Sequence, residues 1–171
     1  MRQVFSLLAM SIAAVLPAAA AQSQLPRSNL ITDQRELLRG LGDISVSVSL
    51  PSEMSFSERT IQTNFELRLR QTGITVDERS GNELALTMTT MHNIDDGGRD
   101  LGSLIYSVDL DMLTMVQIAD FRPEMRLTIA PVWSTSRFGI VGRSRTAEVR
   151  ETLDDMMSRF LNDYLAVNPR R

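Results

Sequence analysis

Residues 104–118, LIYSVDLDMLTMVQI, form the longest alternation of apolar and polar side chains in the chain. The apolar members share one parity: Leu104, Tyr106, Val108, Leu110, Met112, Val116 and Ile118. The other parity holds polar residues: Ser107, Asp109, Asp111 and Gln117. Because successive side chains of a strand point to opposite faces, the pattern predicts one long, bulged strand with one buried and one wet face.

Shorter runs on either side of this strand alternate in the same way. Residues 44–50, ISVSVSL, and residues 83–91, ELALTMTTM, predict two strands, and ITVDE at 74–78 predicts a brief one before the turn at 80–82. Residues 125–133, MRLTIAPVW, predict another strand, which Pro131 restricts to a sheet edge or a bulge. The stretch 134–144, STSRFGIVGRS, is interpreted as a glycine-containing loop.

Three segments have helical spacing. Residues 33–41, DQRELLRGL, predict a short helix capped by Thr32, and Ser55 with Glu58 has the spacing of a capping box at the start of a second helix. That helix places Ile61, Phe65 and Leu69 on one side and stops at Gly73; the third spans 146–167 and stops at Asn168-Pro169.

These elements predict an α+β fold. We expect an antiparallel or mixed sheet of four to five strands, with two amphipathic helices packed on one face and the order β-α-β-β-β-β-α. Residues 32–171 are expected to form this single domain, after a polar tether at 22–31.

The first 21 residues, MRQVFSLLAMSIAAVLPAAAA, have the features of a secretory signal peptide: one Arg, an apolar run and a cleavage region of small residues. Ala19 and Ala21 suit cleavage before Gln22, and cleavage after Ala20 fits almost as well. An uncleaved anchor is the competing interpretation, because Val4 to Ala21 carries no charge, but Pro17 and the alanines favour cleavage. The mature protein is therefore expected to be periplasmic or secreted, with no integral membrane span.

The composition of the 171 residues excludes several classes of protein. There is no Cys, so a disulfide scaffold, a thiolate metal site, a Cys nucleophile and N-terminal lipidation are ruled out. The 18 cationic residues are all Arg and face 21 acidic residues, giving a net charge of −3, so nothing attracts the chain as a whole to nucleic acid. His92 is the single histidine.

The acidic loop at 95–100, DDGGRD, lacks the spacing of a calcium-binding loop and is interpreted as a solvated hairpin turn. His92 lies near Asp95 but has no nucleophile-elbow serine or second histidine to work with, so we interpret it as a surface residue. The sequence therefore predicts no catalytic residue, no metal site and no cofactor.

The segment from Trp133 to Arg145 carries three Arg and no acid, and it leads into the last helix. Arg binds phosphate or carboxylate in bidentate fashion and stacks on aromatic rings. The candidate binding site therefore uses Arg137, Arg143 and Arg145 as anion contacts and Trp133 and Phe138 as apolar anchors. The alternative is that the two aromatics are core residues and the Arg side chains are merely solvated.

The tail of the chain, APVWSTSRFGIVGRS followed by FLNDYLAVNP, resembles that of a group of exported bacterial proteins without an assigned activity. In element order, residues 40–169 are similar to the LptE lipoproteins and to the smaller domains of TolB and CsgG. The resemblance implies a role in envelope assembly and supplies no catalytic residue. The chain departs from the lipoproteins in having no cysteine to acylate.

The predicted function is that of a non-enzymatic periplasmic protein that binds another envelope component, either a protein or an anionic glycolipid. The alternative is a soluble carrier of an apolar small molecule, held between the helices and the sheet. The carrier would need a cavity of a few hundred Å³ lined by Met and Leu. Met at strand and helix spacing is more often core filling.

Overall fold

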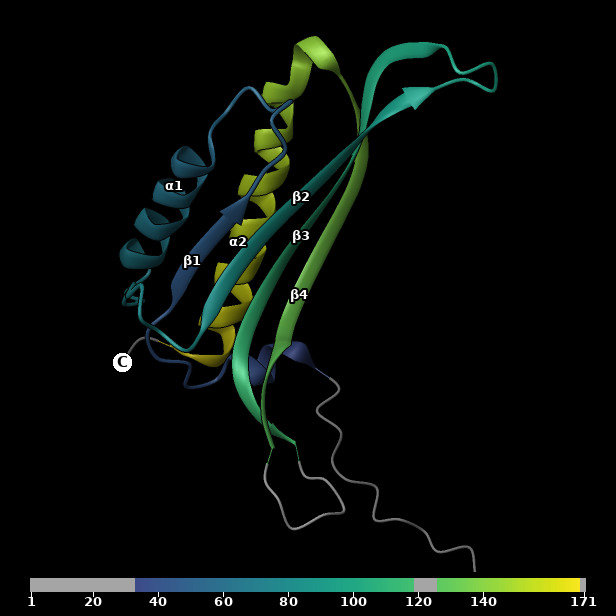
Figure 1. Ribbon diagram of the computed structural model, residues 1–171. Coiled ribbons are helices and arrows are strands. Elements are labelled where there is room, and N and C mark those ends of the chain that lie inside the picture. Colours follow the sequence, from purple (N-terminus) through teal and green to yellow (C-terminus); the bar gives the residue numbers. More distant parts are fainter. Residues whose placement is uncertain (1–32, 119–125, 170–171) are drawn as a thin grey trace, which may run out of the picture. The chain divides into compact units, whose positions relative to one another are not determined.

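The structure is a computed structural model and describes residues 33–118 and 126–169. Its elements in chain order are η1 (Gln34–Leu38), β1 (Ser45–Ser49), α1 (Glu58–Gln71), β2 (Glu83–Ile94), β3 (Asp100–Ile118), β4 (Arg126–Gly142), η2 (Arg143–Glu148) and α2 (Val149–Val167) (Figure 1). The predicted signal peptide at 1–21, the tether at 22–31, the cap Thr32 and the turn at 121–125 lie outside the described residues.

The four strands form one sheet in the order β1-β2-β3-β4. β1 is parallel to β2, whereas β2–β3 and β3–β4 are antiparallel, so the sheet is mixed, and the predicted α+β fold is confirmed. The brief strand predicted at 74–78 is wrong: the segment makes a single parallel bridge, Val76 to Ile44, and then leaves the sheet. Ile74 instead inserts its side chain into the core.

Both α-helices pack on the same face of the sheet (Figure 1). The predicted stripe of α1 is confirmed, because Ile61, Phe65 and Leu69 are buried. The helices are also joined directly: Arg68 of α1 donates to the carbonyl of Asp154 at 3.1 Å and to Ser158 Oγ at 2.7 Å. The sheet contributes its alternating apolar residues to this core: Val46, Leu84, Leu86, Met88, Leu104, Val108, Leu110 and Met112.

β4 is an edge strand that continues through the segment predicted to be a loop. The loop prediction at 134–144 is wrong, because residues 134–142 pair with β3 without interruption and 143–144 begin η2. The bulge comes earlier: Met112 pairs with Trp133 and Leu113 with Pro131, which leaves Val132 as the extra residue. Pro131 has no N–H to donate, so it fits both the bulge and the edge position that the sequence predicts.

The ends of the helices partly differ from the sequence prediction. Ser57 caps α1 by accepting from the N–H of Thr60 at 3.2 Å, so the capping box expected at Ser55 is wrong. Glu58 instead accepts from the N–H of Leu50 at 2.9 Å and ties the helix start to the end of β1. Gly73 ends α1 with a φ of 85°, as predicted. Asp33 caps η1.

None of the helices among the described residues has the length and apolarity needed to cross a membrane.

Gly139 is required in β4 because its strand partner, Tyr106, lies over it. A Cβ at position 139 would approach the Tyr106 hydroxyl to 2.6 Å and its ring to 2.7 Å. Gly139→Ala is therefore expected to lower the free energy of unfolding by about 1–3 kcal/mol in urea titration. Gly142→Ala is the control, since its Cβ would come no nearer than 3.9 Å to Arg145. Equal losses in the two variants, or no recovery when Tyr106→Ala is combined with Gly139→Ala, would contradict this explanation.

Candidate functional site

Trp133, one of the predicted anchors, is a core residue. Its side chain is only 2% exposed, and its ring meets Phe160 of α2 edge-on with 5.2 Å between centroids. The indole Nε1 donates to Asp163 Oδ2 at 3.0 Å. The exposed-anchor prediction for Trp133 is therefore wrong, because burial and this hydrogen bond hold the ring between β4 and α2.

A polar hollow of about 550 Å³ opens beside Trp133, between η1, β4 and α2. Its polar groups largely satisfy one another: Arg35 is paired with Asp33 at 2.6 Å, and Gln34 accepts from the N–H of Ser134 at 3.3 Å. The hydrogen bond between Ser134 and Gln34 links η1 to the edge of β4. The hollow is lined by Asp33, Gln34, Arg35, Trp133, Ser134, Arg159 and Asp163.

The structure does not bring the three predicted anion contacts together. Arg143 donates to the Asp100 carboxylate and to His92 Nδ1, and Arg145 pairs with Glu148 at 2.8 Å. Arg137 projects from β4, about 17 Å of strand away from Gly142, and donates to the carbonyl of Ser136 at 3.1 Å. Anion binding by these three residues stays a prediction, and two of the three already have acidic partners.

Asp100, His92 and Arg143 form a cluster close to the turn of the β2–β3 hairpin. The pKa of Asp100 is lowered first by the hydrogen bond from the N–H of Gly102, and then by the hydrogen bond and the charge of Arg143. At the tip of the hairpin, Asp95 Oδ1 accepts from the N–H groups of Gly97 and Arg99 at 2.9 and 2.8 Å. Within residues 33–118 and 126–169, no three His, Asp or Glu side chains are grouped as metal ligands.

Phe138, the other predicted aromatic, lies on the sheet face opposite the helices. It is 73% exposed, and Ile140 two residues further along β4 is 62% exposed. Strand register places Met91, Ile105 and Ile140 in one row across β2, β3 and β4, next to the row of Ser107 and Phe138. We name Met91, Ile105, Phe138 and Ile140 the hairpin-end patch, and beside it lies a shallow hollow of about 130 Å³.

The opposite end of the same open face is also apolar. Met115 pairs with Ile129, and Gln117 pairs with Leu127. The three apolar residues are 58–67% exposed, and we name Met115, Leu127 and Ile129 the turn-end patch. Isolated exposed apolar residues are ordinary, but large ones gathered in register on one sheet face are typical of an interaction surface.

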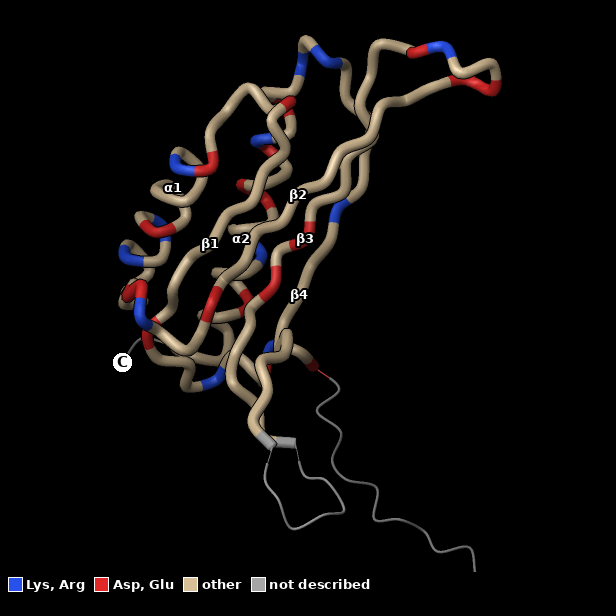
Figure 2. The backbone as a smooth tube through the Cα atoms, in the orientation of Figure 1, with Lys and Arg blue, Asp and Glu red and all other residues tan. Residues whose placement is uncertain are grey.

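Between the two patches the open face is acidic. Asp109 and Asp111 share the open face of β3, and Figure 2 shows acidic positions at the middle of this strand. Ser136 Oγ donates to Asp109 Oδ1 at 2.6 Å. Partial burial raises the pKa of Asp111, and the charge of Asp109 raises it further. We name Asp109 and Asp111 the acidic band.

Sequence reasoning missed this surface although its signal was present. Ser134, Ser136, Phe138 and Ile140 alternate with Trp133, Thr135 and Val141 along β4 from the bulge at Val132 to the end of the strand. The glycines and serines of the segment led to the loop interpretation, and that interpretation hid the parity that places Phe138 on the open face.

No family model and no curated protein matches this chain. Among the solved structures that resemble it at low similarity are three lipoproteins. A minor lipoprotein from Acinetobacter baumannii is 11% identical, has a TM-score of 0.38, and the alignment covers 72% of this chain and 90% of the lipoprotein. The rare lipoprotein B of Shewanella oneidensis is 12% identical, with a TM-score of 0.30 and coverage of 73% and 92%.

The third structure, an uncharacterized lipoprotein B from Nitrosomonas europaea, is 12% identical, with a TM-score of 0.30 and coverage of 74% and 81%. All three are lipoproteins, as are the LptE proteins that the element order resembles. At these TM-scores the likeness carries no functional argument, so membership of a particular envelope family stays a prediction.

The opposite placements of Trp133 and Phe138 predict opposite effects on stability. Trp133→Ala is expected to lower the free energy of unfolding by about 3–5 kcal/mol, because it empties a core position. Phe138→Ser is expected to change it by less than about 0.5 kcal/mol, because the ring is 73% exposed. Urea unfolding followed by circular dichroism measures both values. A large loss for Phe138→Ser would mean that the open face is packed rather than free.

The raised pKa of Asp111 predicts a pH dependence of stability. The native state binds the carboxyl proton of Asp111 more tightly than the unfolded chain does, in which the pKa of this carboxyl is near 3.8. The free energy of unfolding therefore falls as the pH rises through the native pKa. Asp111→Asn removes this component. Its stability relative to the natural chain should therefore increase between about pH 3 and about pH 7.

Urea titrations of the natural chain and of Asp111→Asn at the two pH values measure the difference. Asp155→Asn, an exposed position on α2, controls for the general effect of removing one negative charge. If the two variants show the same pH dependence, the environment of Asp111 is not the cause.

Proposed function

We propose that the chain is a non-enzymatic protein of the bacterial envelope that docks another envelope protein on the open face of its sheet. The observation that carries the proposal is the pair of apolar patches, aligned by strand register at the two ends of a face that neither helix covers. The signal-peptide pattern of residues 1–21 supports export to the periplasm or beyond.

The chemistry of the face favours a partner with two apolar contacts and a basic group between them. Asp109 and Asp111 repel each other on β3, and Asp111 is partly desolvated. A Lys or Arg of a partner would relieve that repulsion, while the hairpin-end and turn-end patches would supply the apolar area. The acidic band therefore provides specificity, and the patches provide affinity.

Two other occupants fit the face less well. A second copy of the chain facing the first would bring like-charged acidic bands together, which costs free energy. An anionic glycolipid would meet the same repulsion, and Arg143 and Arg145 already have carboxylate partners. The geometry therefore supports a protein partner over the glycolipid.

The carrier alternative has no specific observation in its favour. The core residues between helices and sheet are at most 9% exposed, and the two largest hollows described open at the surface and have many polar lining residues. The non-enzymatic assignment rests on His92, the single imidazole, which is half exposed and held by Asp100 and Arg143 rather than beside a nucleophile.

Site-specific photo-crosslinking in cells tests the proposal. A photoreactive amino acid replaces Phe138 or Ile129 on the open face, and Leu67 on the outer side of α1 serves as the control, since it is 52% exposed. We expect one discrete protein adduct from both open-face positions and none from Leu67. The double variant Asp109→Lys, Asp111→Lys is expected to abolish that adduct by reversing the charge of the acidic band.

Each alternative result contradicts a definite part of the proposal. The same adduct from Leu67 would show contact without a preferred face. A protease-resistant adduct that contains lipid would replace the protein partner with a glycolipid. An adduct that still forms in the charge-reversed variant would contradict the proposal that a basic group of the partner contacts the acidic band.

A further inference from the structure

β1 is the other edge of the sheet, and its outer side is open over a short, defined length. In a strand, the backbone groups of successive residues alternate between the two neighbours. Ser45 donates inward to the carbonyl of Asn82, whereas Ile44 exchanges outward hydrogen bonds with Thr75 and Asp77. The N–H and C=O groups of Val46 and Val48 therefore point outward, away from β2.

Both ends of this open length are closed by the chain itself. Ile44 is paired to the segment that carries Val76, and the N–H of Leu50 is bound by the Glu58 carboxylate. Between these two contacts, the only strand that β1 pairs with among the described residues is β2. The outward backbone groups of Val46 and Val48 are thus left for another chain.

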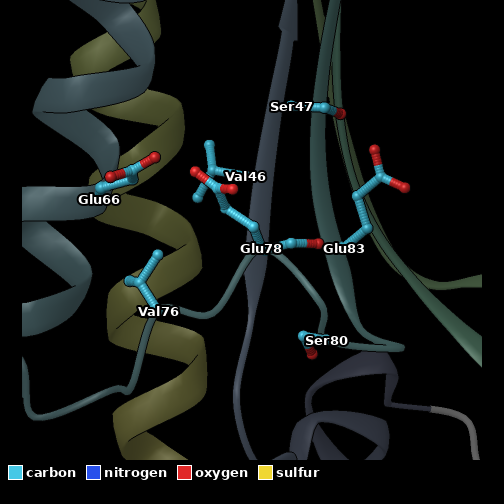
Figure 3. A pocket seen from close by; sticks show the side chains of 8 residues that line it. Val46, Ser47, Glu66, Val76, Glu78, Ser80 and Glu83 are labelled. Atoms are coloured by element: carbon cyan, nitrogen blue, oxygen red, sulfur yellow. The ribbon is translucent and has the colours of Figure 1, made fainter.

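A groove of about 300 Å³ opens at this position, and its lining comes from both sides of β1 (Figure 3). Glu66 of α1 and Val76 lie on the helix side, whereas Ser47 and Glu83 lie on the open-face side. The remaining lining residues are Ser45, Val46, Glu78 and Ser80. The groove therefore follows the strand edge instead of entering the core.

The charge of the groove selects the kind of chain that fits. Three of its lining residues are Glu, and none is Arg. Glu66 already accepts hydrogen bonds from Gln62 and Arg70. Glu78 and Glu83 make none of the ion pairs found among the described residues, so their carboxylates meet whatever enters the groove.

We propose that the β1 edge binds an extended polypeptide segment with Lys or Arg at alternate positions, which adds to the sheet as a fifth strand. The incoming backbone pairs with Val46 and Val48, and its basic side chains reach Glu78 and Glu83. Strand addition takes affinity from backbone hydrogen bonds and specificity from alternate side chains. The inference uses neither the patches nor the acidic band, so it does not rest on the proposed function.

The test uses three synthetic octapeptides of alternating Lys-Val, Gln-Val or Glu-Val and the isotope-labelled chain without residues 1–21. NMR titration is expected to show that only the Lys-Val peptide binds and that it slows amide hydrogen exchange at Val46 and Val48. Binding should weaken with added salt, because the contacts between the Lys and Glu side chains are exposed.

Two variants separate the charge from the strand pairing. Glu78→Gln with Glu83→Gln is expected to weaken Lys-Val binding by about three- to tenfold, which corresponds to two exposed ion pairs. The matched control, Glu53→Gln with Glu151→Gln, removes two exposed charges elsewhere and should leave the affinity unchanged. Val48→Pro removes an outward N–H while keeping the bonds to β2, and it should abolish the protection from exchange at the remaining reporter amide, that of Val46.

The proposal is overturned if the Lys-Val peptide leaves exchange at Val46 and Val48 unchanged at saturation, or if it protects Val46 equally well in Val48→Pro. Equal binding of the Gln-Val peptide would overturn the requirement for basic residues. Perturbations confined to Phe138 and Ile140 would move the peptide to the open face, which would overturn this inference while leaving the proposed function standing. Circular dichroism confirms that each variant is folded.

Discussion

One-sided burial of the sheet is the constraint on which the other features depend. Away from the hairpin turn, the apolar side chains of one parity on β2 and β3 are buried beneath α1 and α2, and the helices are in turn linked through Arg68. Burial of a large apolar side chain such as Phe65 or Phe160 contributes roughly 1.5–3 kcal/mol. This core explains why the residues that face the helices are apolar, but it does not require apolar residues on the opposite face of the sheet. The exposed side chains of Phe138 and Ile140 are therefore not explained by the fold.

The sequence predicted those parts of the fold that have a regular period. The alternation in residues 104–118 gave β3 and its buried face, and the spacing of Ile61, Phe65 and Leu69 gave α1. The prediction failed where a tertiary contact overrides local composition. Gly139 and its serine neighbours favour a loop, yet pairing with β3 and the cover of Tyr106 hold them in a strand.

The candidate site was harder to predict, because its decisive contacts join residues far apart in the chain. Arg143 has no acid beside it in sequence, but Asp100, next to the turn of the β2–β3 hairpin, pairs with it. No residue near Trp133 in the sequence is an evident partner for its indole N–H, which donates to Asp163 of α2 in the structure. Counting charges within a segment therefore overestimated its free positive charge. The alternation of side chains along a strand, by contrast, can be predicted from neighbouring residues alone. Once residues 133–142 are recognised as a strand, this alternation places Phe138 and Trp133 on opposite faces of the sheet.

The mixed topology also sets the order in which the sheet is assembled. β2, β3 and β4 follow one another as hairpins, whereas β1 meets β2 only after residues 50–82 have been looped out. Closing this segment costs about 1.7 kcal/mol more in chain entropy than closing the turn at 95–99, because the cost grows with the logarithm of loop length. The antiparallel strands can thus pair before β1 arrives. During that interval the future β1 edge does not yet exist, and the outer side of β2 is the temporary edge of the sheet.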